Sequence, residues 1–154
     1  MLAQNPDSLD PGPSQQVSCA AHNGELHGCS ISLGSLSHTI RRPDGTFFPF
    51  GDVVAVVMSD NSGSPRPDGL LNGVSCAVVQ DELHVTVIDE GGSIWHTIRD
   101  VNGCFGPFGE VIATVLAQNP GSPNPGTASV VEWLTLSRNI ASHNLSTTAR
   151  ACSV

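Results

Sequence analysis

The sequence contains no lysine and no tyrosine. Its six arginines stand against fourteen acidic residues, which gives a formal net charge of −8 at pH 7. A chain with this charge repels a phosphate backbone at long range, so nucleic acid is excluded as a partner class. No apolar run approaches the roughly twenty residues that a membrane-spanning helix needs, so we expect no membrane span.

Signals for targeting and for catalysis are also missing. The start, MLAQNPDSLDPG, lacks the basic and apolar regions of a secretory signal, which leaves both extracellular and cytoplasmic locations open. The same LAQNP recurs at Leu116–Pro120, so we expect the chain to begin in the middle of an array. No GxSxG, HExxH, phosphate-loop or dinucleotide motif occurs, and we expect neither an enzyme nor a bound cofactor.

The metal-ligating residue types do not form a ligand set in the sequence. Five cysteines occur without a CxxC pair, and Cys19 and Cys76 lie in apolar runs, where cysteine acts as a small buried hydrophobe. His27 and His38 recur as His84 and His96. Because zinc needs three or four converging ligands, we expect these histidines to be structural and to bind no metal.

The most informative feature present is an internal repeat of about 57 residues. VSCA occurs at residues 17 and 74, ELH at 25 and 82, HTIR at 38 and 96, and PFG at 49 and 107. A fixed period of this size indicates a modular array. We divide the chain into a linker (1–16), a first repeat (17–73), a second repeat (74–126) and a divergent tail (127–154).

Each repeat predicts four consecutive antiparallel strands. In the second repeat these are VSCAVV, ELHVTVI, SIWHTIR and FGPFGEVIATV, all rich in β-branched or aromatic residues. Asn23-Gly24, Asp44-Gly45 and Asn102-Gly103 separate such runs and favour two-residue hairpin turns, in which both central residues have positive φ. The fold class is therefore all-β, with two tandem four-stranded antiparallel sheets.

The linkers between repeats are rich in proline and glycine, which continue neither a sheet nor a helix. A β-propeller of four-stranded blades fits this pattern best, and a β-sandwich is the alternative. Closed propellers have roughly four to eight blades, so two blades form an incomplete ring. We therefore expect a homo-oligomer or part of a longer propeller.

The tail after Pro125 loses the repeat. It reads EWLTLSRNIASHNLSTTARACSV without ELH, HTIR or a hairpin dipeptide. Either it is a capping segment, with a helix over Ser129–Ile140, or the reading frame has shifted or the repeat has decayed.

The phrase GELHxxxISxGxLxHTIRRPDGTFFPFGDV and its second form, DELHVTVIDEGGSIWHTIRDVNGCFGPFGEV, carry a family resemblance. They resemble the blade repeat of bacterial lectin propellers of the fucose-binding PLL type and of related tectonin-like arrays. The resemblance covers Val17–Val115 and implies a non-catalytic protein that binds glycans at sites between blades. The first repeat departs from the second at Ser37, where the second has Trp95.

The candidate sugar-binding residues lie in the third strand of each repeat. Trp95, Thr97 and Arg99 alternate onto one face, as do Thr39 and Arg41 in the first repeat. An indole ring packs on the apolar side of a pyranose, and a guanidinium donates several fixed hydrogen bonds. The alternative is that Trp95 fills space between blades and that Arg99 pairs with Asp100, Glu90 or Glu110.

Repeated acids offer a second interpretation, which we set aside. Asp52 and Glu110 occur once per repeat, whereas a glycosidase needs one asymmetric pair of carboxylates. The sequence thus favours a carbohydrate-binding propeller module or fragment. The alternatives are a structural propeller that binds protein partners and a truncated product without a function of its own.

Overall fold

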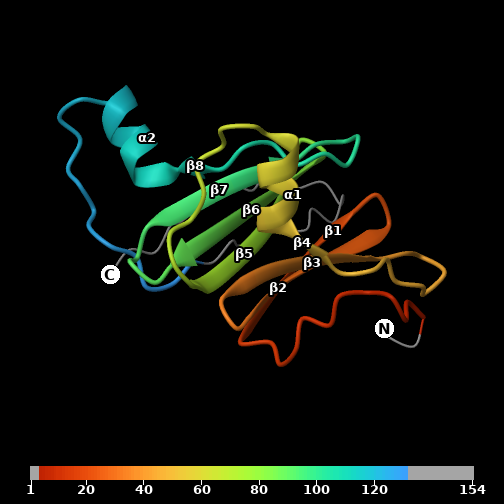
Figure 1. Ribbon diagram of the computed structural model, residues 1–154. Helices are drawn as coiled ribbons and strands as arrows, with labels where there is room; N and C mark the ends of the chain where they lie inside the picture. Colours follow the sequence, from red (N-terminus) through yellow and green to blue (C-terminus); the bar gives the residue numbers. More distant parts are fainter. Residues whose placement is uncertain (1–3, 132–154) are drawn as a thin grey trace, which may run out of the picture.

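Each repeat folds into its own four-stranded antiparallel meander (Figure 1). The computed structural model describes residues 4–131. The first sheet has the order β1-β2-β3-β4 and the second the order β5-β6-β7-β8, which confirms the predicted all-β class and the two antiparallel four-stranded sheets. The strands are β1 (Gln16–His22), β2 (Glu25–Ser32), β3 (Ser35–Arg41), β4 (Gly51–Asp52), β5 (Leu71–Val79), β6 (Glu82–Asp89), β7 (Ile94–Arg99) and β8 (Gly109–Glu110).

Tight turns connect the first two strands of each sheet. Asn23 and Gly24 both have positive φ, 49° and 79°, as the Asn-Gly dipeptide predicts. The corresponding turn of the second sheet uses Gln80 and Asp81, with φ of 51° and 63°, although it contains no glycine. At Asp44-Gly45 only the glycine has positive φ, so this dipeptide does not form the two-residue turn that we expected.

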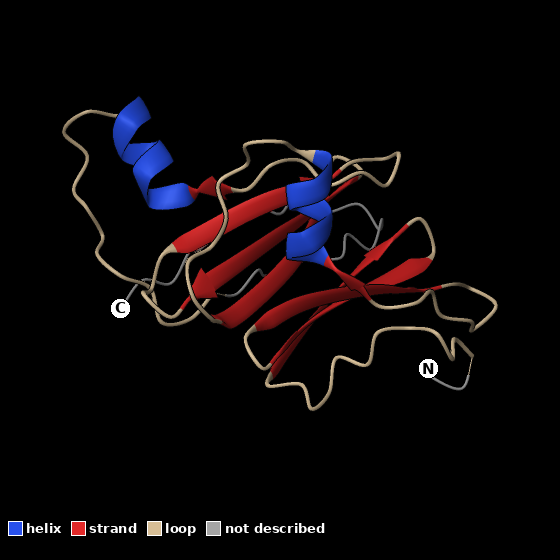
Figure 2. Ribbon diagram, in the orientation of Figure 1, coloured by secondary structure: helices blue, strands red, loops and turns tan. Residues whose placement is uncertain are grey.

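The predicted long fourth strand is wrong in both repeats. The fourth strand has only two residues, preceded by one isolated bridge from Phe47 or Phe105 to the third strand. A helix follows directly: α1 (Val53–Asp60) in the first repeat and α2 (Val111–Gln118) in the second (Figure 2). Asp52 accepts a hydrogen bond from the Ala55 amide at 3.0 Å and so caps the first turn of α1. This cap and the burial of Val53 and Val57 in the core favour a helix in a run of valines whose propensity favours a strand.

The two sheets lie face to face across an interface that we call the seam. Cross-strand pairs place Cys29 beside His38 in the first sheet and Val85 beside Thr97 in the second. The seam contains one buried apolar cluster from both repeats, including Cys29, Ile31, Leu36, Val74, Val85, Val87 and Trp95. Helix α1 completes it with Val53 and Val57. The two repeats therefore share one core.

Strand β1 also protects the free edge of β5. The amide of Val74 donates to Gln16 Oε1 at 2.7 Å, and the amide of Cys76 donates to Ser18 Oγ at 2.9 Å. β5 is an edge strand of its sheet, and an edge strand exposes unpaired backbone groups. Side chains of β1 thus satisfy backbone donors of the second repeat.

The predicted helix and the frame change in the tail lie almost wholly outside the described residues. Within the described part of the chain, no helix is both long and apolar enough to cross a bilayer.

Equivalent positions in the two helices differ sharply in burial. Val57 in α1 is 0% exposed, whereas Val115, its counterpart in α2, is 45% exposed. We expect Val57→Ala to lower the free energy of unfolding by about 2 kcal/mol, because it removes two buried methyl groups and leaves a cavity. Val115→Ala should change it by less than about 0.5 kcal/mol. Urea unfolding at low micromolar protein concentration measures both, and equal losses would contradict this view of the seam.

Candidate functional site

Two paired histidines lie in each sheet, on the face that carries the even-numbered residues of the third strand. His27 Nδ1 lies 3.1 Å from His38 Nε2, and the two rings stack with centroids 5.3 Å apart. His84 and His96 repeat this geometry at 3.0 Å and 5.1 Å. The histidines therefore form two separate pairs, one per repeat. Within residues 4–131 no three histidine, cysteine or acidic side chains converge as a metal site would require.

Only the first pair is enclosed by the seam. Phe105 of the second repeat packs edge-on against His38, with ring centroids 5.8 Å apart. Burial, followed by the neighbouring His27 and by the charge of Arg99, lowers the pKa of His38 to about 3. Burial and Arg99 also lower the pKa of His27, against a smaller opposite effect of Glu25. The seam thus holds this pair in its neutral form.

One ring nitrogen at the seam is buried without a hydrogen-bond partner, namely His27 Nε2. The charge of Arg99 also disfavours protonation of this ring. The guanidinium of Arg99 lies over the turn at Gly103, where an added Cβ would come within 2.7 Å of Nη2. Arg99 is half-buried and reaches solvent at the edge of the seam.

Three of the five residues predicted to bind sugar are buried and already hydrogen-bonded. The indole Nε1 of Trp95 donates to Asp89 Oδ2 at 2.8 Å, inside the core cluster. The hydroxyls of Thr97 and Thr39 donate to the carbonyls of Gly106 and Phe48, each at 2.7 Å. Trp95, Thr97 and Arg99 do share one face, as their alternation predicts, but that face is turned toward the first sheet.

The two predicted arginines occupy equivalent positions with different surroundings. Arg99 lies at the seam, close enough to the first histidine pair to shift its pKa values. Arg41 is exposed, and its Cζ lies 5.9 Å from the ring centroid of Phe47. The structure therefore does not bring the five residues into one site.

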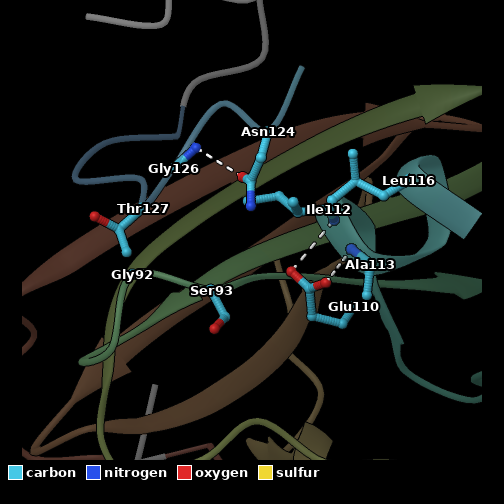
Figure 3. A pocket seen from close by; sticks show the side chains of 9 residues that line it. All are labelled: Gly92, Ser93, Glu110, Ile112, Ala113, Leu116, Asn124, Gly126 and Thr127. Carbon is cyan, nitrogen blue, oxygen red and sulfur yellow. Dashed lines mark hydrogen bonds between the residues drawn. The ribbon is translucent and has the colours of Figure 1, made fainter. Parts of the chain in front are cut away.

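A surface pocket of about 350 Å³ lies instead between α2 and the segment that follows it (Figure 3). Ile112, Ala113 and Leu116 form its apolar wall. Its polar lining includes Ser93, Glu110, Asn124 and Thr127. Pockets of this size hold small ligands, and a mixture of an aliphatic wall with a few polar groups fixes a ligand's orientation.

The acid in this pocket has a structural role of its own. The carboxyl of Glu110 accepts from the amides of Ile112, at 3.2 Å, and Ala113, and so caps α2 as Asp52 caps α1. The repeated acids noted in the sequence are therefore helix caps. The pocket hydroxyls belong to Ser93 and Thr127, which lie in loop segments. No motif or repeat in the sequence marked these two residues as candidates for binding.

The cysteines bear out the prediction for one position and not for the other. Cys76 is buried in the seam, as expected for a small hydrophobe, but its counterpart Cys19 is exposed, so that prediction is wrong. The two positions differ because the face that carries Cys76 packs on the first sheet, whereas within residues 4–131 no sheet packs on the face that carries Cys19. Cys29 and Cys76 meet across the seam as free thiols, and the hydrogen bond with Cys76, together with burial, raises the pKa of Cys29 well above its usual value.

No family model matches this chain, and no curated protein matches it.

Acid should destabilise the protein through the enclosed histidines. Because the pKa of His38 is lowered to about 3, the unfolded chain binds more protons than the folded chain between that value and 6.5. The stability that depends on the neutral ring is therefore fully present above pH 6.5. The free energy of unfolding falls as the pH drops through this window. Between pH 7 and pH 5 we expect a loss of about 2 kcal/mol from His38, measured by urea unfolding.

The matched variants are His38→Phe and His96→Phe. In His38→Phe, the loss of unfolding free energy between pH 7 and pH 5 should be smaller by about 2 kcal/mol, because the ring that resists protonation is gone. His96→Phe should reduce this loss less, because His96 is only half-buried. An unchanged slope in His38→Phe would show that another group controls acid sensitivity.

Replacing Trp95 by Phe tests the role of its indole in the core. The phenyl ring keeps the aromatic contact but leaves part of the indole volume empty, and the buried Asp89 carboxyl loses its indole donor. We expect the free energy of unfolding to fall by about 1–3 kcal/mol. A change below about 0.5 kcal/mol, measured by circular dichroism in urea, would argue that this hydrogen bond contributes little.

Proposed function

We propose that the chain is a carbohydrate-binding module of the β-propeller type, with a small glycan held in the pocket beside α2. The observation that carries the proposal is the composition of this pocket. A pyranose presents one apolar face and a rim of hydroxyls. The aliphatic wall of Ile112 and Leu116 suits the face, and Ser93, Thr127 and Asn124 suit the rim.

The architecture supports the propeller part of the proposal. Each repeat is a meander, the two meanders stack face to face, and equivalent first strands lie side by side, with β1 along β5. Adjacent blades of a propeller have this relationship, and the resemblance noted in the sequence implies the same fold.

The charge of the site agrees with an uncharged ligand. Glu110 is the one ionisable group of the pocket lining, and its oxygens are engaged by amides at the start of α2. A neutral saccharide needs no counter-charge and can donate hydroxyl hydrogens to the remaining acceptor positions of the carboxylate. A phosphorylated or sulfated ligand would face this acid without a cation among the lining residues.

The test is a glycan array followed by titration calorimetry with the best-binding sugar. The double variant Ser93→Ala/Thr127→Val removes two hydroxyls and keeps the shape of the wall. We expect at least about tenfold weaker binding, since each neutral hydrogen bond contributes about 1 kcal/mol.

Ser35→Ala is the matched control, because Ser35 occupies the same repeat position as Ser93 but lies outside the pocket. It should bind the sugar as the unchanged protein does. A folded protein that binds no glycan at millimolar concentration would overturn the proposal. Co-purification of one protein partner under those conditions would favour the scaffold alternative.

A further inference from the structure

Two cysteines from different repeats face each other in the seam. Cys29 lies in β2 of the first sheet and is 0% exposed, and Cys76 lies in β5 of the second sheet and is 2% exposed. Both belong to the apolar cluster that the two repeats share, and both are free thiols. Among the cysteines within residues 4–131, these two are the buried ones.

Ser18 shows how closely the two strands approach each other. It is the partner of Cys29 in the β1–β2 ladder, and its hydroxyl accepts a hydrogen bond from the amide of Cys76 at 2.9 Å. Side chains directly opposite in an antiparallel ladder lie on the same face of the sheet. The two thiols are also in contact with each other, because the side chain of Cys76 hydrogen-bonds with that of Cys29.

This pair of thiols exists only because one repeat packs on the other. Cys76 is equivalent to Cys19 in the repeat, and Cys29 is equivalent to Thr86. Inside the first sheet, Cys19 pairs with Gly28 and is exposed, so it lies on the face opposite to that of Cys29. The seam therefore brings together two repeat positions that a single sheet keeps apart.

We propose that the seam is a site of disulfide formation, in which Cys29 and Cys76 become linked through reaction with a small-molecule disulfide such as oxidised glutathione. The thiolate of one cysteine attacks a sulfur of the oxidant, which forms a mixed disulfide and releases one thiol. The second cysteine then attacks the mixed disulfide and releases the other thiol. The two electrons and two protons of the protein thiols thus pass to the two released thiols.

The link and the seam stabilise each other. The disulfide connects the two repeats in the unfolded chain and so removes conformational freedom from that state. By the same thermodynamic cycle, the folded seam favours the disulfide by an equal factor, because it holds the two sulfurs in contact. A native disulfide typically gives a factor of about 100. The seam is therefore reversible in reducing surroundings and locked in oxidising ones.

Burial determines when the oxidant reaches the pair. The hydrogen bond with Cys76, followed by burial, raises the pKa of Cys29 well above its usual value. Because the thiolate is the reacting form, the folded seam protects the pair from rapid oxidation. The disulfide therefore forms while the chain folds or while the seam is open.

The test brings the full chain to equilibrium with mixtures of oxidised and reduced glutathione, once by refolding from urea and once in urea. Free thiols are then alkylated. Trypsin cleaves after Arg41, which separates Cys29 from Cys76, and mass spectrometry identifies the linked peptides. We expect the Cys29–Cys76 link to form about 100-fold more favourably in the folded protein than in urea. Oxidation should raise the midpoint of urea unfolding by about 1–2 M, and reduction should reverse this shift.

Cys19→Ala is the matched control, because Cys19 shares the tryptic peptide of Cys29 but lies on the other face of the sheet. It should leave both the link and the midpoint shift unchanged. Cys29→Ala should abolish both, with its folding checked by circular dichroism in the reduced state. If Cys29→Ala does not fold, Cys29→Thr takes its place, since threonine is the residue at the equivalent position of the second repeat.

The peptide map of the unchanged protein decides the proposal without any variant. The proposal is overturned if Cys29 and Cys76 link no more favourably in the folded protein than in urea. It is also overturned if the link disappears in Cys19→Ala, or if oxidation leaves the urea midpoint where it was.

Discussion

The packing of the second sheet on the back of the first is the interaction on which the rest of the structure depends. It buries the apolar cluster that both repeats share, and it satisfies the free edge of β5 through Gln16 and Ser18. It also encloses His27 and His38 in their neutral form. Neither sheet obtains these contacts alone, because the seam brings them together from both sides.

The sequence predicted which strands form more accurately than it predicted where they end. Alternating β-branched runs and the Asn23-Gly24 turn are local signals, and they identified the first three strands of each repeat. The helices α1 and α2 were missed because Val-rich runs favour strands by propensity. Each helix is capped by a single side chain at the start of the run, Asp52 or Glu110, and this contribution is not part of the propensity of the valines.

Residues that share one face of a strand do not necessarily form a binding site, because that face can be buried against another sheet. Alternation along β7 correctly grouped Trp95, Thr97 and Arg99, since alternation depends only on the strand itself. Whether that group faces solvent depends on which neighbour packs there, and this is a property of the assembly. Trp95 points into the core and bonds to Asp89. The pocket residues Ser93 and Thr127 come together only through the path of the chain around α2.

Equivalent residues in unequal surroundings differ in how strongly they resist protonation. His84 and His96 have the geometry of His27 and His38 but lie on the face of the second sheet opposite the seam. Burial lowers the pKa of His96, and it lowers the pKa of His38 to about 3 where the charge of Arg99 adds to the effect. The pair enclosed by the seam therefore accounts for more of the stability lost in acid than its counterpart does.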